Sequence, residues 1–189
     1  MKAVIAWGSC TGYTEEIARD LFKELQGVVE ECVDIADASF DSLLKYDVLI
    51  CGTPTWDYGE LQQDWEDRLD EIARADLRNK AVAFFGCGDA DGYPDFFQDG
   101  MGILWSHIEP QGATLLGRWS TEGYQFSASQ ALDKDGKHFV GLAIDEHSQH
   151  RLTDTRLKAW VRLLKAQINQ WSAGLQRQPE PQTGVLAGG

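Results

Sequence analysis

A loop rich in glycine and hydroxyl side chains stands between the first buried strand expected in the chain and the helix that follows it. Residues 8–14 read GSCTGYT, after the apolar run 2–7 and before the helical spacing of residues 14–25. Hydroxyl groups and the free amides of a helix N-terminus together suit an anion such as a phosphate. The loop lacks the lysine of a Walker-type phosphate loop and the third glycine of a dinucleotide fingerprint. We therefore expect a terminal phosphomonoester held by neutral donors, and simple helix capping by these hydroxyls is the alternative.

A cysteine inside this loop raises the separate hypothesis of a cysteine phosphatase, in which the thiolate of Cys10 would attack phosphate. Such an enzyme needs an arginine at the far end of the loop to hold the phosphate oxygens. Glu16 stands six residues beyond Cys10, and the nearest arginine is Arg19. The phosphatase hypothesis is therefore not favoured. The four cysteines of the chain form no C-x-x-C pair, so reduced thiols are expected rather than a zinc site or disulfides.

Two further loops each carry a large aromatic residue in a polar stretch that follows a buried strand. Trp56 lies in residues 53–61 (TPTWDYGEL), and Tyr93 lies in residues 87–95 (CGDADGYPD). Ligands of doubly wound sheets bind at the carboxyl ends of the strands, where these loops and the phosphate loop should meet. Each aromatic alone could be a satellite of the core. Two of them beside a phosphate loop suggest a flat conjugated ring between aromatic faces.

These loops are positioned by apolar runs of strand length that alternate with stretches of helical period, which predicts a parallel α/β sandwich. Strands are expected at residues 2–7, 29–34, 47–51, 81–85, 113–119 and 139–145, and helices at 14–25, 61–73, 95–108 and 154–171. The polar, turn-rich residues 120–138 are interpreted as an excursion that interrupts the last strand. Residues 172–189 hold two prolines and four glycines with little apolar content, so a disordered tail is expected there.

Acidic residues clearly outnumber basic residues in this chain. There are 17 basic and 30 acidic residues, for a net charge of −13, which disfavours binding to nucleic acid or to an anionic membrane. Residues 57–76 hold eight acids and two bases, and residues 87–110 hold five acids and no lysine or arginine. No apolar run reaches the roughly 20 residues that span a bilayer, and no signal peptide is recognised. We therefore expect a cytoplasmic protein whose acidic face steers basic partners to these loops.

Three motifs in this order resemble the FMN-binding loops of flavodoxins: G-S-x-T-G-x-T at 8–14, T-P-T-W-D-Y-G-E-L-Q-x-D-W at 53–65, and G-x-G-D-x-x-G-Y at 86–93. The resemblance continues through residues 97–99, 112–114, 119–126 and 140–146 to the last helix around Trp160, so it covers about residues 1–171. It implies a flavodoxin-like three-layer sandwich in one domain, residues 1–171. The sheet would have five parallel strands in the order 2-1-3-4-5, with helices on both faces. Residues 120–138 resemble the insertion of the long-chain branch.

The resemblance also implies a function. The chain would be a low-potential one-electron carrier with non-covalently bound FMN, cycling between semiquinone and hydroquinone, and not an enzyme. A flavodoxin/ferredoxin-NADP reductase would be the donor, redox enzymes would be the acceptors, and the carrier would be a monomer. Trp56 would cover one face of the flavin and Tyr93 the other. The peptide between Asp57 and Tyr58 would rotate on reduction so that its carbonyl accepts a hydrogen bond from the protonated N5 of the flavin, with Gly59 easing the turn.

The residues that the resemblance assigns to FMN belong to the three loops and their surroundings. They are Ser9, Cys10, Thr11, Gly12, Tyr13, Thr14, Pro54, Thr55, Trp56, Asp57, Tyr58, Gly59, Cys87, Gly88, Asp89, Tyr93, Phe96, Gln98 and His147. No metal ligands are expected.

Three residues depart from the family pattern. Tyr13 stands where many relatives carry a lysine, and Cys10 is an unusual member of its loop, so both could tune the affinity for phosphate. His147 stands where relatives often have a second aspartate near the ribityl chain, so it is either a titrating contact or an exposed loop histidine.

We weigh two other functions for a protein with this type of sheet. The first is an FMN-dependent NAD(P)H:quinone oxidoreductase, although the sequence shows no second site for a nicotinamide. The second is a receiver-type phosphoacceptor, which needs paired acids after the first strand. Residues 8–10 contain no acid, so this second function is excluded.

Overall fold

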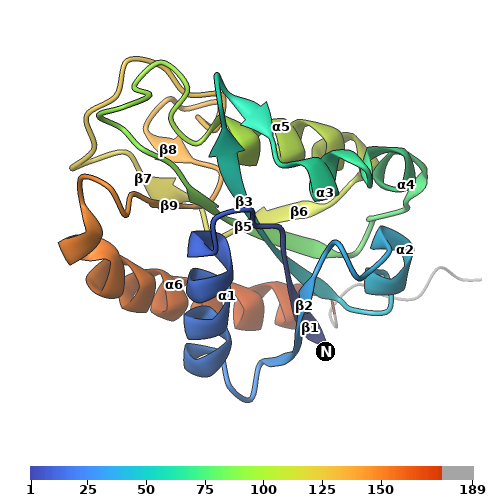
Figure 1. The fold of residues 1–189 in the computed structure, drawn as a ribbon. Coiled ribbons are helices and arrows are strands. Elements are labelled where there is room, and N and C mark those ends of the chain that lie inside the picture. The colour runs from blue at the N-terminus through green and yellow to red at the C-terminus, as the bar shows by residue number, and fades with distance from the viewer. Residues whose placement is uncertain (176–189) are drawn as a thin grey trace, which may run out of the picture.

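The centre of the structure is a mostly parallel sheet of apolar strands. The computed structural model describes residues 1–175. The main strands are β1 (Ala3–Trp7), β2 (Val29–Asp34), β3 (Val48–Trp56), β5 (Ala81–Cys87), β6 (Thr114–Leu116) and β9 (Leu142–Ile144). All seven residues of β5 are buried, because helices cover both faces of the sheet at this central position. Figure 1 shows the sheet between its two helical layers.

The strand order is the one predicted from the sequence. It runs β2-β1-β3-β5, and both β6 and β9 pair with β5 in parallel. β6 pairs with residues 81–83, and β9 pairs with residues 85–87 further along the same strand. The fifth strand of the sheet therefore consists of two pieces, and the insertion leaves between them. This confirms the order 2-1-3-4-5 and the interruption of the last strand.

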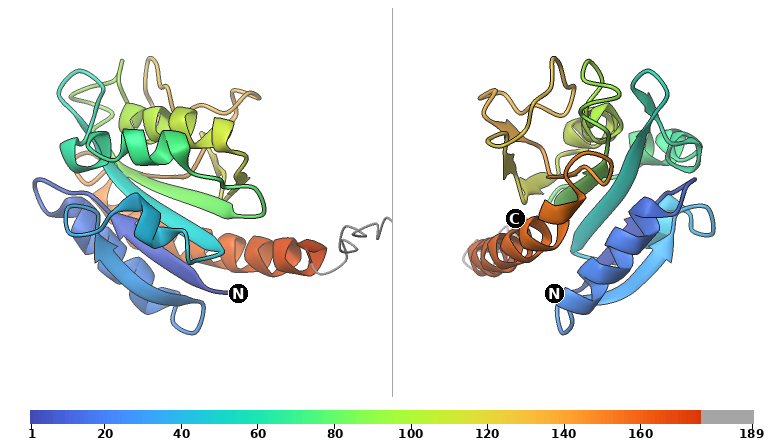
Figure 2. Two further views of the ribbon diagram at one scale, coloured as in Figure 1. Left: turned by 90° about the vertical axis from the view of Figure 1, so that its right-hand side faces the viewer. Right: turned by 60° about the vertical axis from the view of Figure 1, so that its left-hand side comes forward.

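Helices cover the two faces of the sheet in two groups. The helices are α1 (Tyr13–Glu24), α2 (Phe40–Leu43), α3 (Gln63–Glu66), α4 (Leu69–Arg74), α5 (Asp99–Ile108) and α6 (Thr153–Leu175). Helices α1 and α6 pack against each other on one face, as Figure 2 shows, and α5 contacts α4 on the other. Each layer encloses its own buried apolar cluster. No helix among residues 1–175 is long and apolar enough to span a membrane.

The insertion forms a small sheet of its own beyond β6. Strand β7 (Trp119–Ser120) pairs in antiparallel fashion with β8 (His138–Phe139). Tyr124 fastens the insertion to the main sheet, since its hydroxyl donates to the carbonyl of Ala143 at 2.6 Å and the guanidinium of Arg156 lies over its ring. The insertion is thus packed against the end of β9, close to the carboxyl ends of the strands.

Several predicted elements differ in extent from the observed ones. The helix expected at 61–73 is two short helices after strand β4 (Glu60–Leu61), and Arg68 at the break donates to the carbonyls of Ile35, Ala36 and Ala38. The helix expected at 95–108 begins only at Asp99, because Gln98 has a φ of +66°. The strand expected at 113–119 ends at Leu116, next to Gly117 with a φ of +74°.

The carboxyl-terminal prediction also needs a correction. The last helix was expected to end at residue 171, and residues 172–189 were expected to be disordered. Instead α6 continues to Leu175. Trp171, in the last turns of this helix, still packs against the apolar cluster between the sheet and the layer of α1 and α6. Residues 176–189 lie outside the described part of the chain.

Candidate functional site

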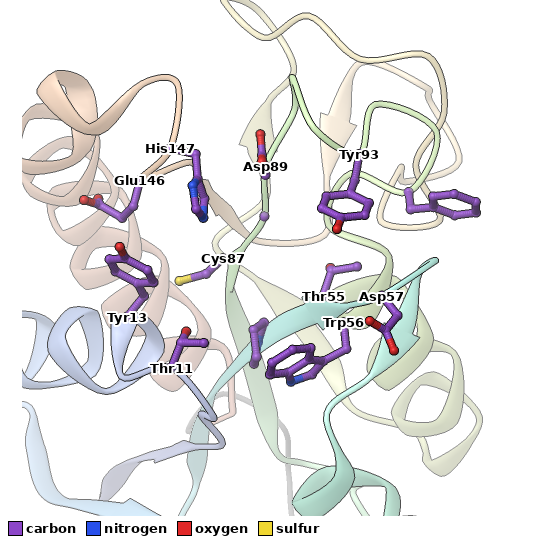
Figure 3. Close-up of a pocket in the computed structure, with 13 residues that line it drawn as sticks. Thr11, Tyr13, Thr55, Trp56, Asp57, Cys87, Asp89, Tyr93, Glu146 and His147 are labelled. Atoms are coloured by element: carbon purple, nitrogen blue, oxygen red, sulfur yellow. The ribbon is translucent and has the colours of Figure 1, made fainter.

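A cavity of about 300 Å³ opens at the carboxyl ends of the central strands, between the three loops singled out in the sequence. Figure 3 shows Trp56, Asp57 and Tyr93 on one side, Tyr13 and His147 on the other, and Cys87 between them. The full lining comprises Thr11, Tyr13, Pro54, Thr55, Trp56, Asp57, Cys87, Gly88, Asp89, Tyr93, Phe96, Glu146 and His147. This volume is at the lower end of the range for small-molecule and cofactor sites.

The first loop presents unpaired donors at the start of α1. Gly12 precedes the helix with a φ of +93° and offers no side-chain cap, so the first N–H groups of α1 stay available. The hydroxyl of Ser9 accepts from the amide of Gly12 at 3.0 Å and shapes the loop. The hydroxyl of Thr14 is buried and has no hydrogen-bond partner within the described chain. A buried hydroxyl costs free energy when it lacks a partner, so Thr14 is suited to an incoming anion.

A close contact holds the start of this loop in place. The amide of Gly8 donates to the carbonyl of Gly52 at 3.0 Å, which ties the loop to β3. A Cβ on Gly8 would lie 2.2 Å from the side-chain oxygen of Gln62 and 3.0 Å from the ring of Trp65. A larger residue would have to displace the carboxamide of Gln62, and the first loop is therefore packed directly against the segment that follows Trp56.

The second loop holds the indole of Trp56 at the edge of the cavity. Trp56 is the last residue of β3, so it belongs to a strand rather than to the loop predicted from the sequence. After it the chain turns through Asp57, with a φ of +39°, and Gly59, with a φ of +96°. The amide of Gly59 closes the turn on the carbonyl of Trp56 at 3.0 Å. The indole nitrogen donates to Sγ of Cys10 at 3.1 Å, which links the first loop to the second.

The third loop is shaped by the side chain of Asp89. Its Oδ1 accepts from the amides of Asp91 at 3.1 Å and Gly92 at 2.9 Å, and its carbonyl accepts from the amide of Tyr93 at 3.0 Å. This local turn leaves the ring of Tyr93 at the mouth of the cavity, with 48% of the residue exposed. One large aromatic side chain thus stands on each of two neighbouring loops.

The wall opposite these aromatics combines Tyr13 and His147. Their rings meet edge to face, with centroids 5.9 Å apart. His147 is exposed and also lines the cavity. Glu146 lines the cavity as well, and sequence reasoning missed it. Its position next to His147 in the same turn was the only signal that could have indicated it.

The chemistry of the lining is that of a binding site. Burial raises the pKa of the Cys87 thiol to about 12, so this side chain is a neutral, apolar part of the wall. Asp57, Asp89 and Glu146 supply carboxylates, while no lysine or arginine lines the cavity. Among the described residues no cluster of acids, histidines and cysteines has the arrangement of a metal site.

The structure brings most, though not all, of the predicted residues to the cavity. Ser9, Gly12 and Thr14 belong to the adjoining first loop, and Cys10 contacts Trp56 from outside the lining. Tyr58 is 76% exposed and packs its ring against Phe96, while Gly59 is buried behind the turn. Gln98 is fully buried, and its amide donates to the carbonyl of Ile144 at 2.9 Å, so it supports the third loop from behind.

Comparison with known proteins gives one consistent answer. The family model described as Flavodoxin matches residues 5–160. Flavodoxin 1 of Salmonella typhimurium is 46% identical over 165 residues, which cover 87% of this chain and 93% of the relative. The chain belongs to the flavodoxin family. The flavodoxin of a Nostoc species is 45% identical to this flavodoxin over 167 residues, or 88% of this chain and 97% of the relative.

Solved structures agree with the fold of this flavodoxin. The crystal structure of Fusobacterium nucleatum flavodoxin bound to flavin mononucleotide has a TM-score of 0.82 at 24% identity. The match covers 88% of this chain and 98% of that one. The oxidised flavodoxin 1 of Bacillus cereus has a TM-score of 0.62 at 25% identity, over 87% of this chain and 98% of the other. Flavodoxins are electron-transfer proteins rather than enzymes, and this chain is therefore an electron carrier.

Proposed function

We propose that this flavodoxin binds one FMN non-covalently in the 300 Å³ cavity and carries electrons one at a time between redox proteins. The observation that supports it most strongly is the buried, unpartnered hydroxyl of Thr14 beside the uncapped start of α1. The Thr14 hydroxyl, the free amides at the start of α1, and the hydroxyls of Ser9 and Thr11 form a set of neutral donors. Such a set can hold a phosphate without a lysine.

The flavin ring fits the other half of the cavity. Trp56 and Tyr93 offer two aromatic faces from neighbouring loops, and stacking between them would exclude water from the ring. Pro54, Thr55, Asp57, Gly88, Asp89 and Phe96 surround that half of the cavity. His147 and Glu146 would face the ribityl chain on the side of Tyr13. When bound, FMN supplies a centre that takes up single electrons, and the protein supplies its orientation and electrostatic environment.

The carboxylates of the site would make negative charge on the ring costly. Asp57 and Asp89 line the cavity, and no cation lines it to offset them. Each carboxylate close to a group that gains an electron opposes that gain, and more so where water is excluded. The lining thus favours a carrier of low potential. The turn at Asp57 and Gly59 would give the backbone beside the ring the freedom to reorient a peptide toward it.

The partners of the carrier follow from its surface. The acids that surround the cavity would attract proteins with a basic docking face. A flavodoxin/ferredoxin-NADP reductase is proposed as the donor and redox enzymes as the acceptors. We also propose a monomer, and a cytoplasmic location because all four cysteines are free. The alternative, an NAD(P)H:quinone oxidoreductase, is not favoured because the named relatives are flavodoxins.

Fluorescence titration with FMN and with riboflavin tests the binding proposal. The fluorescence of FMN should be quenched when the flavin stacks on Trp56 and Tyr93, and the titration should end at one FMN per chain. Riboflavin lacks the phosphate and should bind at least about tenfold more weakly, because charge-assisted hydrogen bonds of about 1.5–3 kcal/mol are lost. Unquenched FMN, or equal affinity for the two flavins, would contradict the proposed site.

A further inference from the structure

The carboxylate of Asp145 is fully buried directly behind the wall of the cavity. Asp145 follows β9, has 0% exposure, and is not part of the cavity lining. No lysine, arginine or histidine of the described chain lies within ion-pair distance of it. A buried charge without a counter-ion is costly, and it persists only where hydrogen bonds satisfy it. Its hydrogen bonds should therefore matter to the surrounding structure.

Those hydrogen bonds come from two different loops. Oδ1 accepts from the amides of His147 at 3.0 Å and Ser148 at 2.8 Å, which forms a tight turn immediately after β9. Oδ2 accepts from the hydroxyl of Ser148 at 2.5 Å and from the amide of Ala90 at 3.1 Å. Ala90 is 55 residues away in sequence and belongs to the third loop. One side chain therefore joins the two loops that face each other across the cavity.

The bond to Ala90 lies at the base of the loop that positions Tyr93. Asp89, next to Ala90, lines the cavity and organises the turn that leads to Tyr93. A second link runs beside it, since the amide of Gly88 donates to the carbonyl of Ile144 at 3.0 Å. The backbone link at Gly88 leaves the chain free to pivot beyond that residue, and the bond to Asp145 removes this freedom.

We propose that Asp145 is a positioning residue for the flavin. It holds the loop of Asp89 and Tyr93 against the turn of Glu146 and His147, and so sets the separation of the two sides of the cavity. The inference rests on the FMN site proposed above. It predicts that the aromatic cover by Tyr93 depends on a carboxylate that does not touch the cofactor.

The variant Asp145→Asn separates the two roles of this side chain. The amide oxygen of asparagine can still accept from the two amides of the local turn at His147 and Ser148. The amide NH₂ would then face the N–H of Ala90, which is donor against donor. The link to the third loop is therefore lost while the turn survives. Asp145→Ser is a second variant that should keep the turn and lose the link to the third loop. A serine hydroxyl can accept from the amides of the turn but is too short to reach Ala90.

The matched control is Ser148→Ala. It removes the hydroxyl that donates to Oδ2 and leaves the bond to Ala90 in place. Loss of this hydroxyl should change the FMN dissociation constant by less than about threefold, because the bond that joins the two loops is kept. Far-UV circular dichroism of each variant without FMN verifies that it is folded.

Binding of FMN and of riboflavin is then compared among the parent and the three variants. In Asp145→Asn and Asp145→Ser both flavins should bind about tenfold more weakly, the worth of one buried hydrogen bond. The preference for FMN over riboflavin should stay at the parent value, because the phosphate loop has no bond to Asp145. The bound flavin should also regain part of its fluorescence, since Tyr93 covers it less completely.

Two results would overturn the inference while leaving the FMN site intact. One is a folded Asp145 variant whose FMN affinity and quenching equal those of the parent. The other is a loss of affinity in Ser148→Ala as large as in Asp145→Asn, which would show that Ala90 is not the link. A parent protein that binds no FMN would instead contradict the proposed function itself.

Discussion

The variant Trp65→Ala is expected to lower the free energy of unfolding of the FMN-free protein by about 3–5 kcal/mol, the range for truncating a buried aromatic side chain. Trp65 is fully buried, and its indole nitrogen donates to the carbonyl of Gly52 at 2.8 Å. Its ring also lies against Gly8 at the start of the first loop. Alanine would leave a cavity between β3 and the first loop, and the carbonyl of Gly52 would keep only its bond from the amide of Gly8. Urea unfolding followed by circular dichroism measures the change.

A phenylalanine at the same position provides the control. Trp65→Phe keeps most of the apolar contact and loses only the hydrogen bond to Gly52, which should cost about 0.5–1.5 kcal/mol because the carbonyl keeps its bond from Gly8. If Trp65→Ala unfolds at the same urea concentration as the parent, the packing described for the base of the first and second loops is incorrect.

Replacement of Trp56 by alanine is expected to produce the largest loss of FMN affinity among single changes that leave the fold intact. Stacking of a planar heterocycle on an aromatic side chain contributes about 1–3 kcal/mol, so the dissociation constant should rise about ten- to a hundredfold. Trp56 is only half-buried, which limits the effect on stability. Fluorescence titration gives the affinity, and urea unfolding without FMN verifies that the fold is unchanged.

The variant Trp56→Phe distinguishes stacking from the contact with Cys10. Phenylalanine keeps an aromatic face and loses the bond from the indole nitrogen to Sγ of Cys10. Its affinity should lie close to that of the parent if stacking dominates. Equal affinities of Trp56→Ala and the parent would show that the indole does not cover the ring.

The sequence predicted the parts of the site that depend on local residue types. Residues 8–14 combine glycines with hydroxyls, and Trp56 and Tyr93 stand outside any periodic apolar pattern. Each of these features is a property of a short segment, and the alternation of elements places the segments at one edge of the sheet. The order of the strands followed from the resemblance to flavodoxins, whereas the alternation indicated only a parallel α/β sandwich. These predictions needed no knowledge of long-range contacts.

The remaining features depend on contacts between distant segments. The helix expected at 61–73 breaks where Arg68 turns to carbonyls about 30 residues earlier in the chain. The close approach at Gly8 depends on Gln62, and the link between the two loops depends on Asp145 and Ala90. None of these pairs has a signature within a short window of sequence. Glu146 was missed for a related reason, because an acid in an acidic chain has no distinguishing pattern.

The electron-carrier account is tested most directly by stopped-flow reduction of the FMN-loaded protein. NADPH alone should leave the flavin absorbance unchanged on the timescale of seconds, because the chain is expected to have no site that brings a nicotinamide to the ring. Addition of a catalytic amount of a flavodoxin/ferredoxin-NADP reductase should then bleach the absorbance. Higher salt should slow this second reaction, since the acidic surface guides the two proteins together. Rapid bleaching by NADPH alone would contradict the account and identify the protein as an oxidoreductase.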